Sequence, residues 1–205
     1  MSLPRPSVFR IDVRLRDIEP PIWRRIEIPA RASFWDLHVA IQDAMGWLDY
    51  HLHEFSLALS RAARPLRIGI PDDETGSEVL PGWEETIALH FRAPGDRALY
   101  VYDFGDDWHH DVELVAIEPR IKGTRYPRCV AGERACPPED CGGPPGYFEL
   151  THALASPGNP EHQALVEWIS GYRRDGRPYD PEAFDPAEVR FSSAARRLRA
   201  LLERE

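Results

Sequence analysis

The feature that most constrains this chain is an alternation of apolar and polar residues near its start. Every second residue from Phe9 to Leu15 is apolar, and the residues between them are charged. A period of two is typical of a β-strand with one face buried and the other in water. A second strand is expected over residues 22–28, after a proline-containing turn at 19–21. The chain therefore opens with an antiparallel hairpin.

A helix is expected next. Ser33 is a suitable N-cap residue, and Gly46 is typical of the residue that ends a helix. Between them the apolar residues recur at helical spacing: Phe34, Leu37, Ile41, Ala44 and Met45. One face of this helix should lie across the sheet.

Further strands are expected before residue 118, with a tight turn at Gly105-Asp106-Asp107. They cover residues 51–59, 86–91, 98–104 and 108–117. The segment 61–82, rich in Pro, Gly and acidic residues, is expected to be an irregular loop with at most one short strand.

The last third of the chain carries helical signals instead. Helices are expected over residues 147–155, 160–172 and 185–205, the last capped by Asp185 with Pro186 following. Strands first and helices later indicate an α+β fold, in which one antiparallel or mixed sheet curls around a helix as a roll. The length predicts a single domain over residues 1–205, with its core at about 8–190, a Cys/Gly/Pro loop at 129–146 and a helical part at 147–205.

Charge and hydropathy exclude several classes of protein. No apolar run approaches the roughly 18 residues needed to cross a bilayer, and the start lacks a secretion signal, so a cytoplasmic protein is expected. The net charge of −9 disfavours binding nucleic acid over the whole surface. The Arg-rich amphipathic segment at 190–205 has two interpretations: a local contact with nucleic acid or an acidic partner, or a solvated helix face.

Strand parity separates the histidines of the two central strands. His110 shares a face with Val112 and should point inward, whereas the adjacent His109 should face water. His51 and His53 share the apolar face of the strand at 51–59. These three inward imidazoles are either core histidines held by hydrogen bonds or ligands of a metal ion.

Three cysteines lie in the Cys/Gly/Pro loop, which has few apolar residues to hold it. Cys129, Cys136 and Cys141 are an odd number, unsuited to a disulfide framework. Three thiolates and one imidazole, from His110 or His53, would make a closed structural zinc site. The alternative is three reduced cysteines in a proline-braced loop.

A binding groove is expected between these sequence blocks. The aromatic residues Trp47, Tyr50 and Trp108 flank the inward histidines and should form its walls. Asp103 shares strand parity with Val101, so a buried position is expected, with a His or Arg partner. Asp106 and Asp107 fit ordinary turn chemistry.

Three sequence blocks resemble those of the plasmid pRiA4b ORF-3-like proteins. They lie at residues 20–25 with 46–55, at 102–110, and at 132–147, which contains Cys-Pro-Pro-Glu-Asp-Cys-Gly-Gly. The resemblance covers roughly residues 8–190 and implies an α+β roll with a groove. It also implies an association with plasmids and mobile elements, and some relatives carry a transposon-resolvase label. No activated serine in an Arg-rich site supports recombinase chemistry here.

The sequence therefore favours a cytoplasmic, zinc-stabilised module that binds a protein or nucleic-acid partner without catalysis. The alternative hypothesis is a metal-dependent, nuclease-like hydrolase. Its open metal site would be built from His51, His53, Asp103 and His110.

Overall fold

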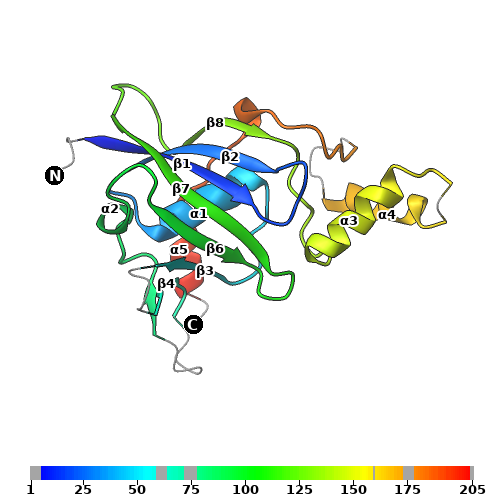
Figure 1. Ribbon diagram of the computed structural model, residues 1–205, viewed down its shortest axis with the longest axis horizontal. Helices are drawn as coiled ribbons and strands as arrows, with labels where there is room; N and C mark the ends of the chain where they lie inside the picture. The colour runs from blue at the N-terminus through cyan, green and yellow to red at the C-terminus, as the bar shows by residue number, and fades with distance from the viewer. Residues whose placement is uncertain (1–5, 59–63, 72–77, 159, 173–177, 204–205) are drawn as a thin grey trace.

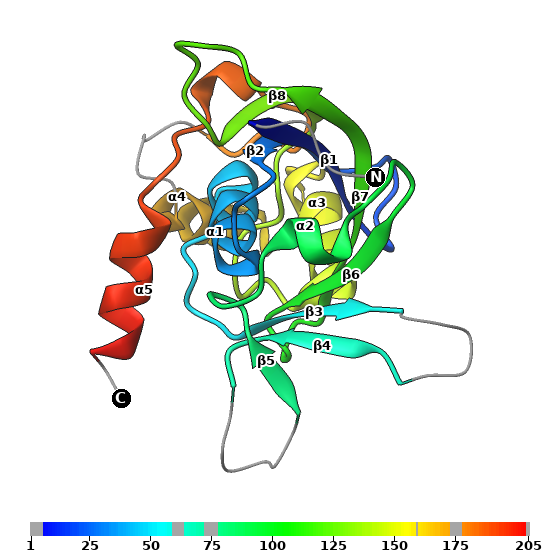
Figure 2. The ribbon, with the colours of Figure 1, turned by 90° about the vertical axis from the view of Figure 1, so that its left-hand side faces the viewer.

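An eight-stranded sheet organises the chain in a computed structural model that describes residues 6–58, 64–71, 78–158, 160–172 and 178–203. The strand order is β5-β4-β3-β6-β7-β1-β2-β8, and every neighbouring pair is antiparallel except β4 with β5. The strands are β1 (Ser7–Leu15), β2 (Trp23–Pro29), β3 (His53–Leu57), β4 (Leu66–Gly69), β5 (Val79–Pro81), β6 (Arg97–Tyr102), β7 (Trp108–Pro119) and β8 (Arg128–Glu133). The expected α+β fold is confirmed, and the sheet curls without closing (Figures 1 and 2).

Helix α1 (Phe34–Met45) lies inside the curl of the sheet, as Figure 2 shows. Its first turn is fixed by a capping box in which the Ser33 hydroxyl accepts from the Asp36 N–H and the Asp36 carboxylate accepts from the Ser33 N–H. Gly46 ends the helix at φ 94°, a left-handed conformation that glycine adopts without strain. Both helix boundaries expected from the sequence are confirmed.

The hydrophobic core lies between α1 and the concave face of the sheet. The first hairpin pairs Ile11 with Ile26, and the alternating residues of β1 are all buried. On β6 and β7 the inward positions carry large aromatic rings, including Tyr100, Tyr102 and Trp108. The core is therefore aromatic and partly polar near the central strands.

Two predicted assignments in the sheet region were wrong. Residues 86–91 are not a strand, because α2 (Ile87–His90) makes one helical turn that buries Ile87 and Phe91, four residues apart, on the same side. The first part of the Cys/Gly/Pro loop is also not irregular, because β8 pairs with β2 at the sheet edge. The segment predicted as a loop holds two short strands, β4 and β5, and its residues 61–63 and 72–77 lie outside the described residues, as does Leu59.

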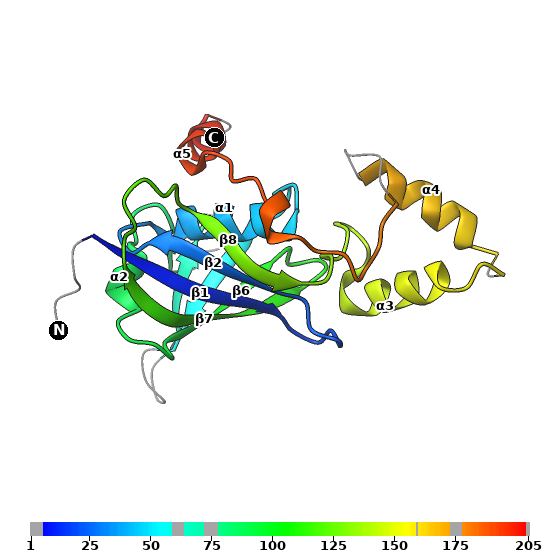
Figure 3. The same ribbon diagram turned by 90° about the horizontal axis from the view of Figure 1, so that it is seen from above.

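Helices α3 (Gly143–Leu154) and α4 (His162–Tyr172) form a pair that projects to one side of the sheet (Figures 1 and 3). The single helix expected over 185–205 is instead two helical pieces separated by extended chain at residues 189–193. A one-turn 3-10 helix, η1 (Pro186–Glu188), begins at the predicted Asp185 cap, and α5 (Ala194–Leu202) begins after Ser193 caps the Arg196 N–H. Between them Ser192 donates to Asp43 of α1, which holds the chain extended.

No helix among the described residues is long and apolar enough to cross a membrane.

Candidate functional site

The two adjacent histidines of β7 point in opposite directions, as strand parity predicts. His110 is fully buried, whereas His109 is partly exposed and pairs with Asp107 at 2.8 Å. The His110 Nδ1 lies 3.4 Å from the Tyr100 carbonyl oxygen, and its Nε2 has no hydrogen-bond partner in the part of the chain that the structure describes. Burial lowers the pKa of His110 to about 3, so this imidazole is neutral.

A second buried imidazole, His53, stacks on His38 of α1. Their ring centroids are 3.4 Å apart, with 6° between the planes. His38 contacts the Tyr100 hydroxyl at 2.9 Å and the Asp49 carboxylate at 2.8 Å, whereas neither His53 nitrogen has a hydrogen-bond partner among the described residues. Burial and the neighbouring His38 lower the pKa of His53 well below its usual value. His38 was not predicted from the sequence. Gln42, one turn later, places a second polar side chain on the same side of this helix, and that spacing was the available indication.

The three cysteines do not form a ligand group with these histidines. Cys129 lies on β8 and donates to the Ala131 carbonyl at 3.3 Å, Cys136 is buried, and Cys141 is half-buried. Burial raises the pKa of all three thiols, to about 12 for Cys141, which disfavours the thiolate. The zinc site expected from the sequence therefore stays a prediction without an assembled set of ligands among the described residues.

His51 does not lie on the strand. It precedes β3 and is half-exposed, and it meets two carboxylates from distant segments. Its Nε2 lies 3.0 Å from Asp140 Oδ1 and 3.5 Å from Asp103 Oδ2. Ligand atoms of these three residues, the His51 cluster, all lie within 4.8 Å of one another. Asp103 is buried with a His partner, as expected, while Asp140 was not predicted.

Two short turns bring the carboxylates of the cluster together. Asp103 Oδ1 accepts from the Gly105 and Asp106 N–H groups at 2.9 and 3.3 Å, as in an Asx turn. Asp106 Oδ2 in turn accepts from the Gly142 N–H at 3.1 Å. The backbone approach is so close that a Cβ at Gly143 would collide with the Asp106 carbonyl oxygen. The second glycine of the Cys-Gly-Gly block thus permits this docking.

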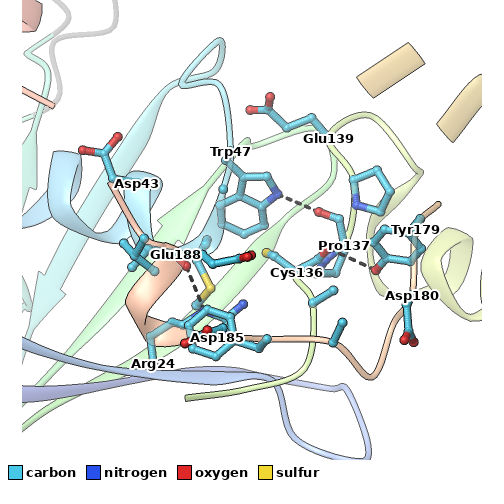
Figure 4. A pocket seen from close by; sticks show the side chains of 18 of the residues that line it. Arg24, Asp43, Trp47, Cys136, Pro137, Glu139, Tyr179, Asp180, Asp185 and Glu188 are labelled. Atoms are coloured by element: carbon cyan, nitrogen blue, oxygen red, sulfur yellow. Dashed lines mark hydrogen bonds between the residues drawn. The ribbon is translucent and has the colours of Figure 1, made fainter. Parts of the chain in front are cut away.

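A separate cavity of about 850 Å³ opens between the end of α1, the segment that follows β8, and residues 178–189 (Figure 4). Residues 178–191 are named the strap. Trp47 donates to the Pro137 carbonyl at 2.9 Å, and Tyr179 donates to the Cys136 carbonyl at 3.0 Å. The two aromatic side chains therefore lie on either side of residues 136–137 (Figure 4). Other apolar lining residues are Met45, Ile169, Phe184 and Val189.

Arg24 of β2 lines this cavity although its side chain is buried. Its guanidinium donates to the carbonyl oxygens of Ala44, Trp23 and Glu133, at 2.8 to 2.9 Å. The Phe184 ring of the strap lies 3.6 Å from the guanidinium carbon. Burial lowers the pKa of Arg24, and no carboxylate of the described residues pairs with it. This arginine therefore ties together β2, β8, α1 and the strap.

Acidic residues supply the exposed charge of the cavity lining. Asp180, Asp185 and Glu188 of the strap are exposed, and Arg24 is the only basic residue among those lining residues that the structure describes. Glu139 is buried deeper, where it accepts from the Tyr102 hydroxyl and from the Leu48 N–H. The burial of Tyr102 and its contact with Glu139 raise the pKa of the tyrosine.

The residues predicted to line one groove lie at separate places in the structure. Trp47 lines the cavity, while Trp108 is buried in the core 6.0 Å from the Trp47 ring. Tyr50 is exposed, and its N–H donates to the Tyr102 hydroxyl at 3.1 Å. His51 and Asp103 belong to the His51 cluster. The strap residues that complete the cavity were not predicted.

These features define a class of protein: an open α+β roll that encloses a helix and carries a cavity lined on one side by residues 178–189. The family description "Plasmid pRiA4b ORF-3-like protein" matches residues 7–188. The chain belongs to this family.

Two relatives extend the comparison. The chain is 33% identical over 196 residues to the "Uncharacterized protein y4hQ" of Sinorhizobium fredii, covering 93% of this chain and 97% of the relative. The crystal structure of a "Protein of Unknown Function", MM3350 from Methanosarcina mazei Go1, is similar with a TM-score of 0.79 and 38% identity. That match covers 91% of this chain and 99% of the solved one.

Proposed function

We propose that this chain is a non-catalytic binding module whose cavity takes a basic, apolar segment of a partner protein. The observation that carries this proposal is the lining of the cavity: aromatic and aliphatic walls beneath an exposed acidic edge. A volume of about 850 Å³ is within the usual range of ligand pockets and accommodates a few side chains.

The walls favour an apolar or aromatic group. Trp47 and Tyr179 are each held by a hydrogen bond to a backbone carbonyl, so their rings are already fixed before a ligand arrives. Fixed rings lower the entropy lost on binding. An aliphatic or aromatic side chain that enters the cavity would bury its surface against these rigid walls.

The exposed acidic edge of the cavity favours a positively charged ligand. Three exposed carboxylates of the strap line the cavity and would attract Lys or Arg side chains and repel phosphate groups. Arg24 offers no site for a phosphate, because its donors are used by backbone carbonyls and Phe184 covers its face, and its single charge is outnumbered by these carboxylates. A protein segment therefore suits the cavity better than nucleic acid, the other partner considered from the sequence.

The hydrolase alternative receives less support. Of the four residues that it requires, His53 and His110 are buried in the core, and neither joins the group formed by His51 and Asp103. A metal-bound water needs an open position next to its ligands. The two core histidines offer none.

The binding proposal is tested with a fluorescein-labelled peptide of alternating Arg and Phe, using fluorescence anisotropy. A peptide with Glu in place of Arg and a single-stranded DNA of similar length are the comparison probes. We expect saturable binding of the Arg-Phe peptide only. Asp180→Lys with Glu188→Lys should weaken it at least tenfold, because two attractive charges become repulsive. The matched control, Glu149→Lys with Glu203→Lys, makes the same charge change at exposed positions outside the cavity and should have a small effect.

Tighter binding of the Glu peptide or the DNA would contradict the proposal. Equal losses in the two charge-changed proteins would also contradict it, because the attraction would then come from net charge alone.

A further inference from the structure

We infer that the His51 cluster is a binding site for one divalent transition-metal ion, with ligands from His51, Asp103 and Asp140. The three residues come from the α1–β3 connection, the β6–β7 turn and the segment before α3. Their ligand atoms converge within 4.8 Å, and it is the one such group in the described part of the chain. This inference is independent of the cavity and of its proposed peptide ligand.

The Asp103 carboxylate supplies the second observation. The residue is only 8% exposed, yet in the described part of the chain no Lys or Arg pairs with it. Its Oδ1 is used by two backbone N–H groups, while its Oδ2 points to His51 at 3.5 Å, longer than a good hydrogen bond. A largely buried carboxylate with no cationic partner nearer than 3.5 Å among the described residues is poorly compensated. A cation between the three side chains would compensate it.

The ligand set indicates which cation fits. One imidazole nitrogen and two carboxylates combine a borderline ligand with hard ones, a set that suits Zn²⁺ or Mn²⁺. Because His51 is half-exposed and Asp140 is exposed, the metal would keep positions open to water. Such a site differs from the closed thiolate site expected from the sequence in its ligands, its position and its access to solvent.

Neighbouring contacts hold the ligands in place before a metal binds. The Asp103 N–H donates to the Leu52 carbonyl at 2.9 Å, which fixes the residue next to His51. The Gly142 N–H donates to Asp106, which fixes the turn of Asp103 against the chain that carries Asp140. Preorganised ligands reduce the entropy lost when the ion binds.

The test is a titration of the full-length protein, freed of metal with a chelator, by calorimetry with Zn²⁺ and by electron paramagnetic resonance with Mn²⁺. Mn²⁺ is the decisive probe, because it prefers oxygen and nitrogen to thiolates. We expect one equivalent of each ion. His51→Gln and Asp140→Asn, both at solvent-accessible positions, should each weaken binding at least tenfold. Circular dichroism spectra verify that the variants remain folded.

The matched control is His109→Gln. His109 forms a similar exposed pair with Asp107 at 2.8 Å but lacks a third ligand, so its replacement should leave the affinity within twofold. The inference is overturned if the native protein binds neither ion, or if His51→Gln and Asp140→Asn bind as tightly as the native protein. It is also overturned if Zn²⁺ binding is lost in Cys141→Ser but retained in His51→Gln.

Discussion

The imidazole rings of His38 and His53 lie face to face in the core, with 3.4 Å between their centroids. His38 contacts Tyr100 and Asp49, while His53 has no hydrogen-bond partner among the described residues. A protonated His53 would hold its positive charge away from solvent and against the ring of His38. The fold therefore requires a neutral His53, and His110 is neutral for the same reason of burial.

This requirement predicts that acid destabilises the protein from about pH 6.5 downward. Folding lowers the pKa of His110 to about 3, so below the ordinary value the unfolded state binds more protons and is favoured. Burial of His110 should therefore lower the unfolding free energy by about 2 kcal/mol between pH 7 and pH 5, and burial of His53 acts in the same direction. Urea denaturation at the two pH values measures this difference.

The native carboxylates contribute little over that range, because their unfolded pKa values are about 4. A variant His110→Phe should lose about 2 kcal/mol of this pH dependence, and His109→Ala, at the partly exposed neighbouring position, is the control. A stability that is unchanged between pH 7 and pH 5 would disprove the neutral-histidine argument.

Arg24 is predicted to be one of the most costly residues to replace. Arg24→Met keeps much of the volume but leaves the Ala44, Trp23 and Glu133 carbonyls without their donor. Unsatisfied buried acceptors should lower the unfolding free energy by about 2–4 kcal/mol. Arg67→Met, which removes an exposed pair with Glu54, is the control and should cost less than about 1 kcal/mol. Similar losses in both variants would contradict the role given to Arg24.

Helix α5 is predicted to depend on a small set of polar contacts. Arg197 reaches Asp43 at 2.5 Å and Asp49 at 3.1 Å, and the Trp35 indole donates to the Ala194 carbonyl at 2.9 Å. Arg197→Met should therefore speed hydrogen exchange in residues 192–202 while the amides of α1 stay protected. Arg199→Met, on the exposed side, should leave exchange as it is. Unchanged exchange in the Arg197 variant would show that α5 is held by other contacts.

Prediction from the sequence was most accurate where apolar and polar residues alternate strictly and one face of the strand is buried. The alternation of β1 and the opposite directions of His109 and His110 follow from the geometry of a strand, so they could be predicted without tertiary information. The same rule failed for residues 86–91, because an apolar pair four residues apart fits one helical turn as well.

The candidate sites depend on contacts between distant segments, which no local pattern specifies. Asp140 meets His51 across 89 positions, and Phe184 covers Arg24 from the strap. The sequence predicted the turn at Gly105-Asp106-Asp107 and contains two glycines at 142 and 143, but it did not indicate that these two segments would dock. Composition likewise indicated that the cysteine loop needed extra stabilisation without revealing that β8 would supply part of it.

The cysteines are predicted to react slowly in the folded protein. Burial raises their pKa values, so few thiolates are present at neutral pH, and Cys136 is buried as well. Ellman's reagent should label fewer than three thiols in the native state and all three in guanidinium. Release of zinc on labelling would instead support the thiolate site expected from the sequence. Rapid native reaction of all three without zinc release would contradict the structure.

Gly143 is predicted to be needed for the docking of α3 against the β6–β7 turn. At φ 68° a side chain is strained, and a Cβ would collide with the Asp106 carbonyl oxygen, which belongs to backbone and cannot swing away. Gly143→Ala should therefore lower the unfolding free energy by about 2 kcal/mol or more, and it should weaken Mn²⁺ binding, because Asp140 and Asp103 would no longer meet. Gly158→Ala is the control, since a Cβ there meets no atom within 4 Å, and it should change neither property. Chemical denaturation and the Mn²⁺ titration measure the two effects. A Gly143→Ala protein with native stability would show that the turn and α3 do not pack as closely as the structure places them.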